Sequence, residues 1–303
     1  MHRAREVTER LRTARAFLFD MDGTLVLGDR DNKGLTPLPG ALELTRHLHE
    51  RNIPFVILTN GTARTPTQYA ELMRGMGFPV ADNMMLTPSA VAAEYLARRG
   101  FKRVLVLGGE GVWRPLAEQG LEVINPSALR PPTTPDPAAA APTSHMPTPA
   151  AQRIDAIFVG WFREFTMDDL EVACHAVWAG AKLFTASMAP FFATANGRAL
   201  GTSRAICAVI SSITGQRASV LGKPSLEALR CAARRLNVNP TEIAVVGDDP
   251  ALEVPMAHRG GSLAIAVHTG IGDTFAFDRL SPAEQPHLTV QNAAELLTQY
   301  IAA

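Results

Sequence analysis

Short apolar runs alternate with longer amphipathic stretches along most of this chain. The short runs lack interleaved polar residues, which is typical of strands buried on both faces of a parallel sheet. The longer stretches repeat apolar residues at helical spacing. The expected strands are Ala16–Phe19, Phe55–Leu58, Val104–Leu107, Ile154–Val159, Lys182–Thr185, Ser219–Leu221, Ile243–Val246 and Leu263–Val267. The expected helices are Ala41–Arg51, Pro66–Met76, Ser89–Arg99, Met167–Ala179, Ser203–Ile213 and Ser225–Leu236.

This alternation predicts an α/β fold, a doubly wound parallel sheet covered by helices. Ligands of such sheets bind beyond the carboxyl ends of the strands. Asp20, Thr59 and Asp248 each fall at that end of an expected strand, and Lys223 falls just past another. We therefore expect these side chains to converge on one site.

One segment breaks the pattern. Between Pro126 and Pro149 there are eight prolines in 24 residues, with almost no large apolar side chains. Such a segment buries too little surface to offset the cost of ordering, so a disordered loop over about residues 126–150 is expected inside a domain. The stretch from Met1 to Arg15 contains five arginines but no apolar core, which favours a helical extension over a secretory signal.

Composition narrows the function classes. The 303 residues suffice for one large or two ordinary domains, with 47% hydrophobic and 19% charged residues. Lys+Arg and Asp+Glu balance at 29 each, so neither a nucleic-acid polymer nor an anionic membrane is indicated as partner. Cys174, Cys207 and Cys231 lack metal spacing and indicate core thiols in a reducing, cytoplasmic compartment. No apolar run reaches the ~18 residues of a membrane span.

Asp20 and Asp22 form the first candidate for chemistry. Side chains at i and i+2 of a strand point the same way, so the two carboxylates repel unless a cation or a proton lies between them. Gly23 permits a tight turn after them. The alternative is a solvated Asp-x-Asp turn.

Three further segments follow expected strands. The segment Thr59–Arg64 offers a hydroxyl and turn amides that suit a phosphate, although a helix-capping turn would have the same sequence. Lys223, in Gly-Lys-Pro-Ser, places a cation that could neutralise a phosphoryl group. Asp248, Asp249 and Glu253 suit a hard cation such as Mg²⁺, or alternatively acids that complement a helix N-terminus.

Together, Asp-x-Asp-Gly-Thr, Thr-Asn, Lys-Pro and Gly-Asp-Asp resemble the four motifs of haloacid dehalogenase superfamily phosphatases, in the same order. The details, including Arg64 after Thr59-Asn60, match best the p-nitrophenyl phosphatase and phosphoglycolate phosphatase-like branch. The resemblance implies an α/β cap inserted between the second and third motifs, because only 36 residues separate Asp22 from Thr59 but 163 separate Thr59 from Lys223. The expected division is a core of residues 1–87 and 199–303 and a cap of residues 88–198.

The resemblance also implies roles. Asp20 is the expected nucleophile and Asp22 the general acid and base, while Thr59 and Lys223 hold the phosphoryl oxygens. Asn60, Gly61 and Arg64 are expected to assist in substrate binding. The expected metal ligands for Mg²⁺ are Asp20, Asp22, Asp248, Asp249 and Glu253. The implied reaction is hydrolysis of a small phosphorylated metabolite.

Two positions depart from the pattern of the branch. Glu253 stands where Asp is commoner, and Thr185–Ala189 replaces a Thr-Asn-Pro-Asp-like stretch near the entrance of the site. Trp161, Arg163, Ser187 and Met188 are therefore candidate contacts of the leaving group, with a cap-core role open for Trp161 and Met188. A ligand-binding or regulatory protein, and phosphoryl transfer to an acceptor other than water, remain alternatives. Relatives often pair through their caps, so a homodimer is a further expectation.

Overall fold

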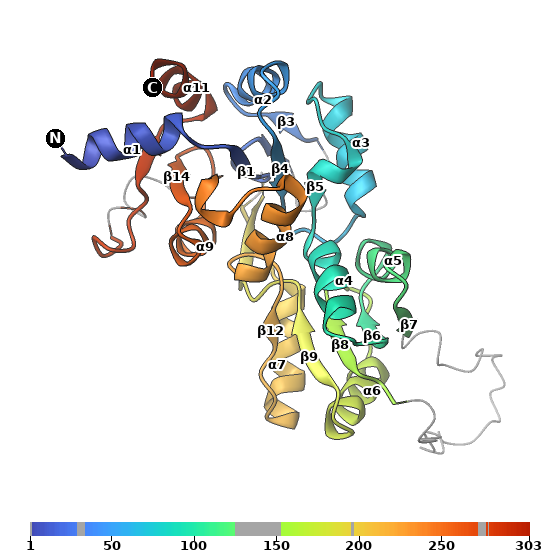
Figure 1. The fold of residues 1–303 in the computed structure, drawn as a ribbon. Helices are drawn as coiled ribbons and strands as arrows, with labels where there is room; N and C mark the ends of the chain where they lie inside the picture. The colour runs from blue at the N-terminus through green and yellow to red at the C-terminus, as the bar shows by residue number, and fades with distance from the viewer. Residues whose placement is uncertain (1, 29–33, 125–152, 195–196, 272–276, 278) are drawn as a thin grey trace, which may run out of the picture.

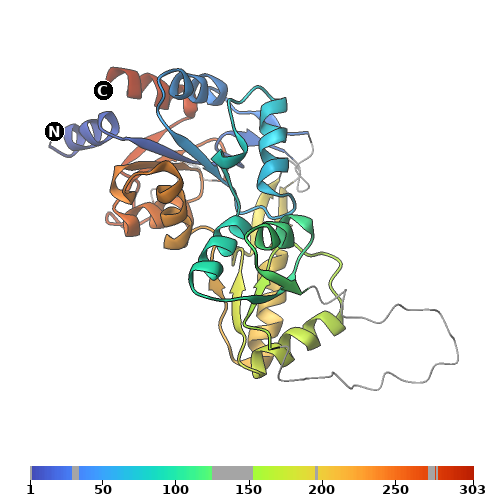
Figure 2. The ribbon, with the colours of Figure 1, turned by 45° about the vertical axis from the view of Figure 1, so that its right-hand side comes forward.

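The computed structural model describes residues 2–28, 34–124, 153–194, 197–271, 277 and 279–303. The whole segment expected to be disordered, residues 126–150, lies outside the described residues. Two parallel sheets, each with helices on both faces, form two lobes (Figure 1). The two chain ends both lie in the same lobe, as Figure 2 shows from another side. This is the α/β architecture with an inserted α/β cap that the sequence predicts.

The first sheet carries the core of the fold. Its six strands run in the order β15-β14-β13-β1-β4-β5, and every neighbouring pair is parallel. All residues of β1, Ala16–Asp20, are buried. Their side chains alternate between the two faces, which is why an uninterrupted apolar run is needed there. The other strands are β4 (Phe55–Leu58), β5 (Met85–Leu86), β13 (Ile243–Gly247), β14 (Leu263–Val267) and β15 (Leu288–Val290).

The second sheet lies in the cap. Its five parallel strands run in the order β12-β9-β8-β6-β7. They are β6 (Arg103–Leu107), β7 (Glu122–Ile124), β8 (Ala156–Val159), β9 (Lys182–Thr185) and β12 (Ser219–Val220). Two antiparallel hairpins complete the strands: β2 (Val26–Leu27) with β3 (Thr36–Pro37), and β10 (Phe191–Thr194) with β11 (Gly197–Leu200).

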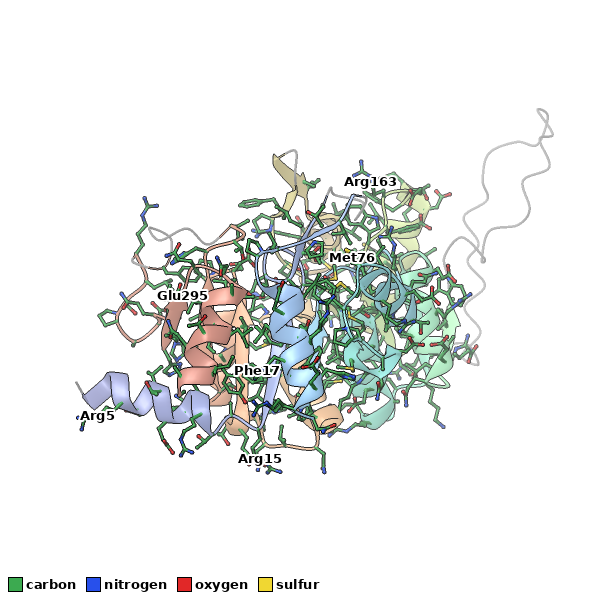
Figure 3. The ribbon with its side chains drawn as sticks, turned by 90° about the horizontal axis from the view of Figure 1, so that it is seen from above. Arg5, Arg15, Phe17, Met76, Arg163 and Glu295 are labelled. Atoms are coloured by element: carbon green, nitrogen blue, oxygen red, sulfur yellow. The ribbon has the colours of Figure 1, made fainter. Side chains whose placement is uncertain are left out.

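Helices cover both faces of both sheets. On one side of the core sheet, α2 (Ala41–Glu50) and α11 (Ala293–Ala302) pack together (Figure 3). The ring of Tyr300 on α11 lies edge-on to the ring of Phe17 on β1, with 5.3 Å between the ring centres. One apolar cluster is continuous from the opposite face of the core sheet to the cap sheet, so the two lobes share packing. The remaining helices are α1 (His2–Arg12), α3 (Pro66–Gly75), α4 (Pro88–Arg98), α5 (Glu110–Glu118), α6 (Met167–Trp178), α7 (Thr202–Thr214), α8 (Leu226–Leu236) and α9 (Glu253–Gly260).

The expected strands and helices are present within two residues of their expected ends. The pattern missed the short strands β2, β3, β5, β7, β10, β11 and β15 and the helices α5, α9 and α11. Two- and three-residue strands are too short to show a period, and α5 carries Pro115 inside the helix. None of the described helices has the length and apolar character needed to cross a membrane.

The pairing of strands places cap elements beyond residue 198, where the cap was expected to end. Strand β12 pairs with β9 in the cap sheet, and α7 packs against α6, β8 and β9. Both elements lie beyond residue 198, the expected end of the cap. We propose that the cap extends to about Val220, because its outer strand and one of its covering helices are otherwise left without the surface they bury against.

Candidate active site

Loops from neighbouring strands meet around one cavity of about 150 Å³. Asp20 ends β1, Thr59 follows β4 and Asp248 follows β13, and these three strands are adjacent in the core sheet. Lys223 comes from the loop after β12, at the junction between cap and core. All four residues line the cavity, so the four sequence segments converge as expected.

Asp20 and Lys223 form a buried ion pair at the base of this cavity. Lys223 is 3% exposed, and its Nζ contacts Asp20 Oδ1 and lies 2.7 Å from Glu253 Oε1. The other oxygen of Asp20, Oδ2, accepts a hydrogen bond from Thr24 Oγ1 at 3.2 Å. The carboxylate is thus fixed at both oxygens.

Burial would lower the pKa of Lys223, but the charges of Asp20 and Glu253 outweigh that effect and raise the pKa above its ordinary value. The side chain is therefore an ammonium throughout the physiological range. It supplies a fixed positive charge next to Asp20.

Asp22 lies beside Thr59 at the cavity wall. Thr59 Oγ1 donates to Asp22 Oδ2 at 3.0 Å and accepts from the Gly61 N–H at 2.9 Å. The turn that follows Asp22 needs Gly23, whose φ is +89°. A Cβ at Gly23 would lie 2.4 Å from Asp248 Oδ2, so glycine also lets β1 and β13 loops approach each other.

Asp248 and Asp249, in the loop after β13, and Glu253, at the start of α9, also line the cavity. Burial, followed by the charges of Asp20 and Glu253, raises the pKa of Asp248 well above its ordinary value. Burial raises the pKa of Asp249 as well. Burial is also the largest cause that raises the pKa of Glu253 to about 7, against the opposing effect of Lys223. The cluster carries more negative charge than Lys223 alone neutralises.

A divalent cation fits this cluster. No set of three His, Cys, Asp or Glu side chains in the described part of the chain is arranged as a metal cage. Mg²⁺, however, is usually bound through only one or two carboxylates and keeps several waters. Asp20 and Asp248 are two buried carboxylates on one cavity, and burial together with the charge of Asp20 raises the pKa of Asp248. A divalent cation held by both carboxylates would offset this repulsion.

Glu253, an expected metal ligand, lies elsewhere in this network. Its Oε2 accepts from the Asp249 N–H at 3.0 Å, while its Oε1 pairs with Lys223. The geometry therefore favours a positioning role for Glu253. A Cβ on Gly247 would lie 2.1 Å from Glu253 Cγ, so the longer acid depends on that glycine.

The cap forms the outer wall of the cavity. Trp161 and Ser187, both expected, line it, whereas Met188 packs against the apolar cluster between the cap sheet and α6 and α7. Arg163 stands at the surface with its guanidinium 5.8 Å from the ring centre of Trp161 (Figure 3).

Asn60 and Gly61 also border the cavity, and Arg64 lines a neighbouring hollow with Gln68 and Glu110. Several lining residues were missed by sequence reasoning: Leu27, Thr62, Tyr69, Ala189, Phe191, Thr202, Ser203, Leu252 and Ile271. Thr62 lies inside the segment Thr59–Arg64, which was already expected at the site, so it could have been predicted from the sequence. Ala189 ends the stretch Thr185–Ala189, which was also singled out. The others come from positions outside the motifs, and only their packing brings them to the site.

Comparisons with known proteins agree with this geometry. Residues 17–122 match the family model of haloacid dehalogenase-like hydrolases, and residues 220–296 match the HAD-hydrolase-like model. The chain is 25% identical to 5'-nucleotidase YutF of Bacillus subtilis, over 86% of this chain and 90% of that protein. It is 27% identical to bovine chronophin (Bos taurus), over 94% and 92%.

Solved structures share the whole architecture. A double mutant of the thermostable NPPase from Geobacillus stearothermophilus superposes with a TM-score of 0.75 at 25% identity, over 94% of this chain and 98% of that one. The family models cover the segments that carry Asp20, Thr59, Lys223 and Asp248, and the relatives span nearly the full length. The chain belongs to the haloacid dehalogenase-like hydrolases and is an enzyme, a hydrolase.

Proposed function

We propose that this protein is a Mg²⁺-dependent phosphatase that hydrolyses small phosphomonoesters through a phosphorylated Asp20. One observation carries the proposal. Asp20 is held by Lys223 and Thr24 at the base of a cavity that also contains the carboxyl groups of Asp22 and Asp248. A nucleophile, an acid, a fixed cation and a place for a metal ion are thus within one small site.

In the first half of the reaction, a carboxylate oxygen of Asp20 attacks the phosphorus, and the bond from phosphorus to the leaving oxygen breaks. Asp22 donates a proton to that oxygen, so the product leaves as an alcohol. Thr59 holds the Asp22 carboxyl through the hydrogen bond at 3.0 Å. In the second half, the Asp22 carboxylate takes a proton from water, which attacks the phosphorus and frees phosphate and Asp20.

The metal ion would be held by Asp20, the backbone carbonyl of Asp22 and Asp248. When bound, it supplies positive charge that offsets the repulsion between the Asp20 carboxylate and the phosphate. Lys223 provides a second positive charge that does not depend on the metal. Glu253 keeps the Lys223 ammonium in place through their ion pair at 2.7 Å.

The relatives named as a nucleotidase and a p-nitrophenyl phosphatase support a small phosphomonoester as the substrate. Nucleoside monophosphates, sugar phosphates and phosphorylated acids are all small phosphomonoesters of this kind. The wall opposite Asp20 mixes apolar side chains with hydroxyls, including Trp161, Phe191 and Ser187. This wall contacts the alcohol part of the substrate and selects among these compounds.

The test is phosphate release from p-nitrophenyl phosphate with and without Mg²⁺. We expect turnover that depends on Mg²⁺ and is lost in Asp20→Asn, which removes the nucleophile but keeps its size. Turnover that persists in Asp20→Asn or in excess chelator would refute the mechanism. Phosphorylated product formed from added alcohols would instead identify a phosphotransferase.

We also propose that two chains associate through their caps. Met167 and Trp178 on α6 and Ile213 on α7 are 66%, 59% and 52% exposed. Large apolar side chains on two packed helices of one face are typical of a protein–protein contact. Light scattering is expected to give the mass of a dimer, and Trp178→Glu to give a monomer. A monomeric wild-type protein would contradict this assembly.

A further inference from the structure

The loop that follows β14 contacts two parts of the candidate metal site. β14 pairs with β13 in the core sheet, so its carboxyl end brings this loop beside Asp248. Thr269 Oγ1 donates a hydrogen bond to the Gly23 carbonyl at 2.6 Å. Two residues later, the Ile271 N–H donates to Asp248 Oδ2 at 2.7 Å. One short segment thus holds both the glycine turn after β1 and the Asp248 carboxylate.

The contact with Gly23 bears on the backbone carbonyl of Asp22, which is a proposed metal ligand. The Gly23 N–H donates to Val26 O at 2.8 Å. The carbonyl of a trans peptide points away from its N–H, so this bond sets the direction of the Asp22 carbonyl. Gly23 has a φ of +89°, and glycine alone does not restrain its own backbone. Because Thr269 holds the next carbonyl, the Gly23 backbone is fixed on both sides.

The position of the Asp248 carboxylate depends on the same loop. Asp248 is 4% exposed, and a Cβ on Gly23 or on Gly270 would overlap its carboxyl group. The Ile271 N–H orients one of its oxygens. Carboxylates that bind metal ions are usually held by such hydrogen bonds from residues that do not touch the ion. The close approach of Gly270 and the amide of Ile271 therefore restrict where this oxygen can lie.

We infer that Thr269 and Gly270 are positioning residues for the metal ion, which hold the Asp22 carbonyl and the Asp248 carboxylate in the arrangement that binds Mg²⁺. The inference rests on the proposed phosphatase function and extends it to a loop that carries none of the four motifs. Neither residue lines the cavity in the part of the chain that the structure describes. Their effect on turnover therefore passes through the metal site.

Thr269→Val tests the contact with the glycine turn, because it keeps the shape of the side chain and removes the hydroxyl. The Kd for Mg²⁺ is measured by calorimetric titration of the protein without substrate. We expect Kd to rise about tenfold, since loss of a group that orients a metal ligand typically weakens binding 10–100-fold. Thr269→Ser keeps the hydroxyl and should keep the wild-type Kd. Thr298→Val is the matched control, because its hydroxyl donates to Ala294 O on α11.

Gly270→Ala tests the contact with Asp248 and keeps the hydroxyl of Thr269. The added methyl group overlaps the Asp248 carboxylate and displaces it, so the Kd for Mg²⁺ should rise at least about tenfold. Gly109→Ala is the matched control, because a Cβ at Gly109 has no other atom within 4 Å.

Steady-state kinetics separate positioning from a loss of fold. With p-nitrophenyl phosphate, the Mg²⁺ concentration that gives half of the maximal rate should rise by the same factor as Kd in Thr269→Val. Its kcat at saturating Mg²⁺ should change much less, because the reacting groups are unaltered. A variant that only weakened the fold would have a lower melting temperature without Mg²⁺ and an unchanged Kd.

The outcomes distinguish this inference from the proposed function. A wild-type protein that binds Mg²⁺, together with an unchanged Kd in Thr269→Val and in Gly270→Ala, overturns the inference and leaves the phosphatase intact. If Thr269→Val does not fold, an unchanged Kd in Gly270→Ala is enough to overturn it. A wild-type protein that neither binds Mg²⁺ nor hydrolyses p-nitrophenyl phosphate overturns the proposed function itself.

Discussion

Asn60 holds Lys223 through both ends of its side-chain amide. Asn60 Nδ2 donates to the Lys223 carbonyl at 3.1 Å, and Asn60 Oδ1 accepts from the Lys223 N–H at 2.8 Å. The loop after β4 of the core sheet is thereby tied to the loop after β12 of the cap sheet. A Cβ on Gly222 would lie 2.5 Å from Asn60 Oδ1, so glycine is needed for this approach. The pair fixes the backbone from which the Lys223 side chain enters the site.

Asn60→Asp tests this clamp. The change replaces the donor to the Lys223 carbonyl with an oxygen that repels it, which costs about 1–3 kcal/mol. We expect kcat to fall at least about tenfold, since the Lys223 ammonium would no longer be fixed beside Asp20. Asn83→Asp, the same change at an exposed position, is the control. Unchanged steady-state kinetics of Asn60→Asp would show that the clamp does not matter for turnover.

Lys223→Met removes the positive charge that Asp20 and Glu253 share. By comparison with lost oxyanion donors, we expect kcat to fall by about 10²–10³-fold or more. The buried carboxylates of Asp20 and Glu253 would be left without a cation to neutralise them, so the free energy of unfolding should fall by ~3 kcal/mol. Chemical denaturation measures this loss.

A second change separates the two effects of Lys223→Met. Adding Glu253→Gln removes one of the unpaired charges and should restore part of the stability without restoring turnover. Full recovery of activity in the double variant would show that Lys223 serves only to neutralise Glu253.

The core site could be predicted from sequence for a physical reason. Asp20, Thr59 and Asp248 follow long, fully buried strands, and the rule that ligands bind beyond such strands brings them together. The same rule does not extend to Glu253, whose partner depends on the space that Gly247 leaves. It also gives no information on Thr202, because the contact of α7 with the cavity depends on how cap and core pack.

For Lys223, the sequence indicated the chemistry of the side chain but not the sheet to which the preceding strand belongs. Its motif indicated a phosphate-binding cation, but its strand, β12, proved to belong to the cap sheet. A two-residue strand carries no signal for which sheet it joins, so the expected domain boundary fell short of it. The expected role of Lys223 depends on neighbouring residues in the sequence, whereas the pairing of β12 with β9 depends on residues far apart in the chain.

The stability of the metal-free protein should fall as pH rises from about 4.5 to about 7. The pKa of Glu253 is raised from 4.5 to about 7, chiefly by burial, so the folded state binds a proton more tightly than the unfolded state in this window. The raised pKa of Asp248 acts in the same direction. Urea denaturation between pH 5 and 8 in chelator measures the slope.

Glu253→Gln provides the control for this pH dependence. It cannot titrate at this position, so its stability should depend less on pH, with the remaining slope due to Asp248. A wild-type protein that becomes more stable over the same pH window would contradict the assignment of these raised pKa values.

Mg²⁺ should raise the melting temperature of the wild-type protein. An ion that binds only the folded state stabilises it in proportion to the logarithm of its concentration above Kd. The gain should increase as pH rises, because the ion competes with the proton that the raised pKa of Asp248 helps to retain. Asp248→Asn should abolish the gain, while Asp168→Asn, at an exposed acid of α6, should preserve it. An equal Mg²⁺ effect in Asp248→Asn would place the ion elsewhere.

Thr62 links the core to the substrate wall of the cap. Its Oγ1 accepts a hydrogen bond from the Trp161 N–H at 2.8 Å, and both residues line the cavity. Thr62→Val leaves that buried N–H without this acceptor and loosens the backbone that carries the Trp161 ring. If Trp161 contacts the alcohol part of the substrate, as proposed, KM should rise about three- to tenfold, consistent with a loss of ~1 kcal/mol, with a much smaller change in kcat. Thr67→Val, an exposed position on α3, is the matched control. A selective loss of kcat in Thr62→Val would place Thr62 among the groups that act on the transition state, and equal kinetics would show that the cap wall is held by its other contacts.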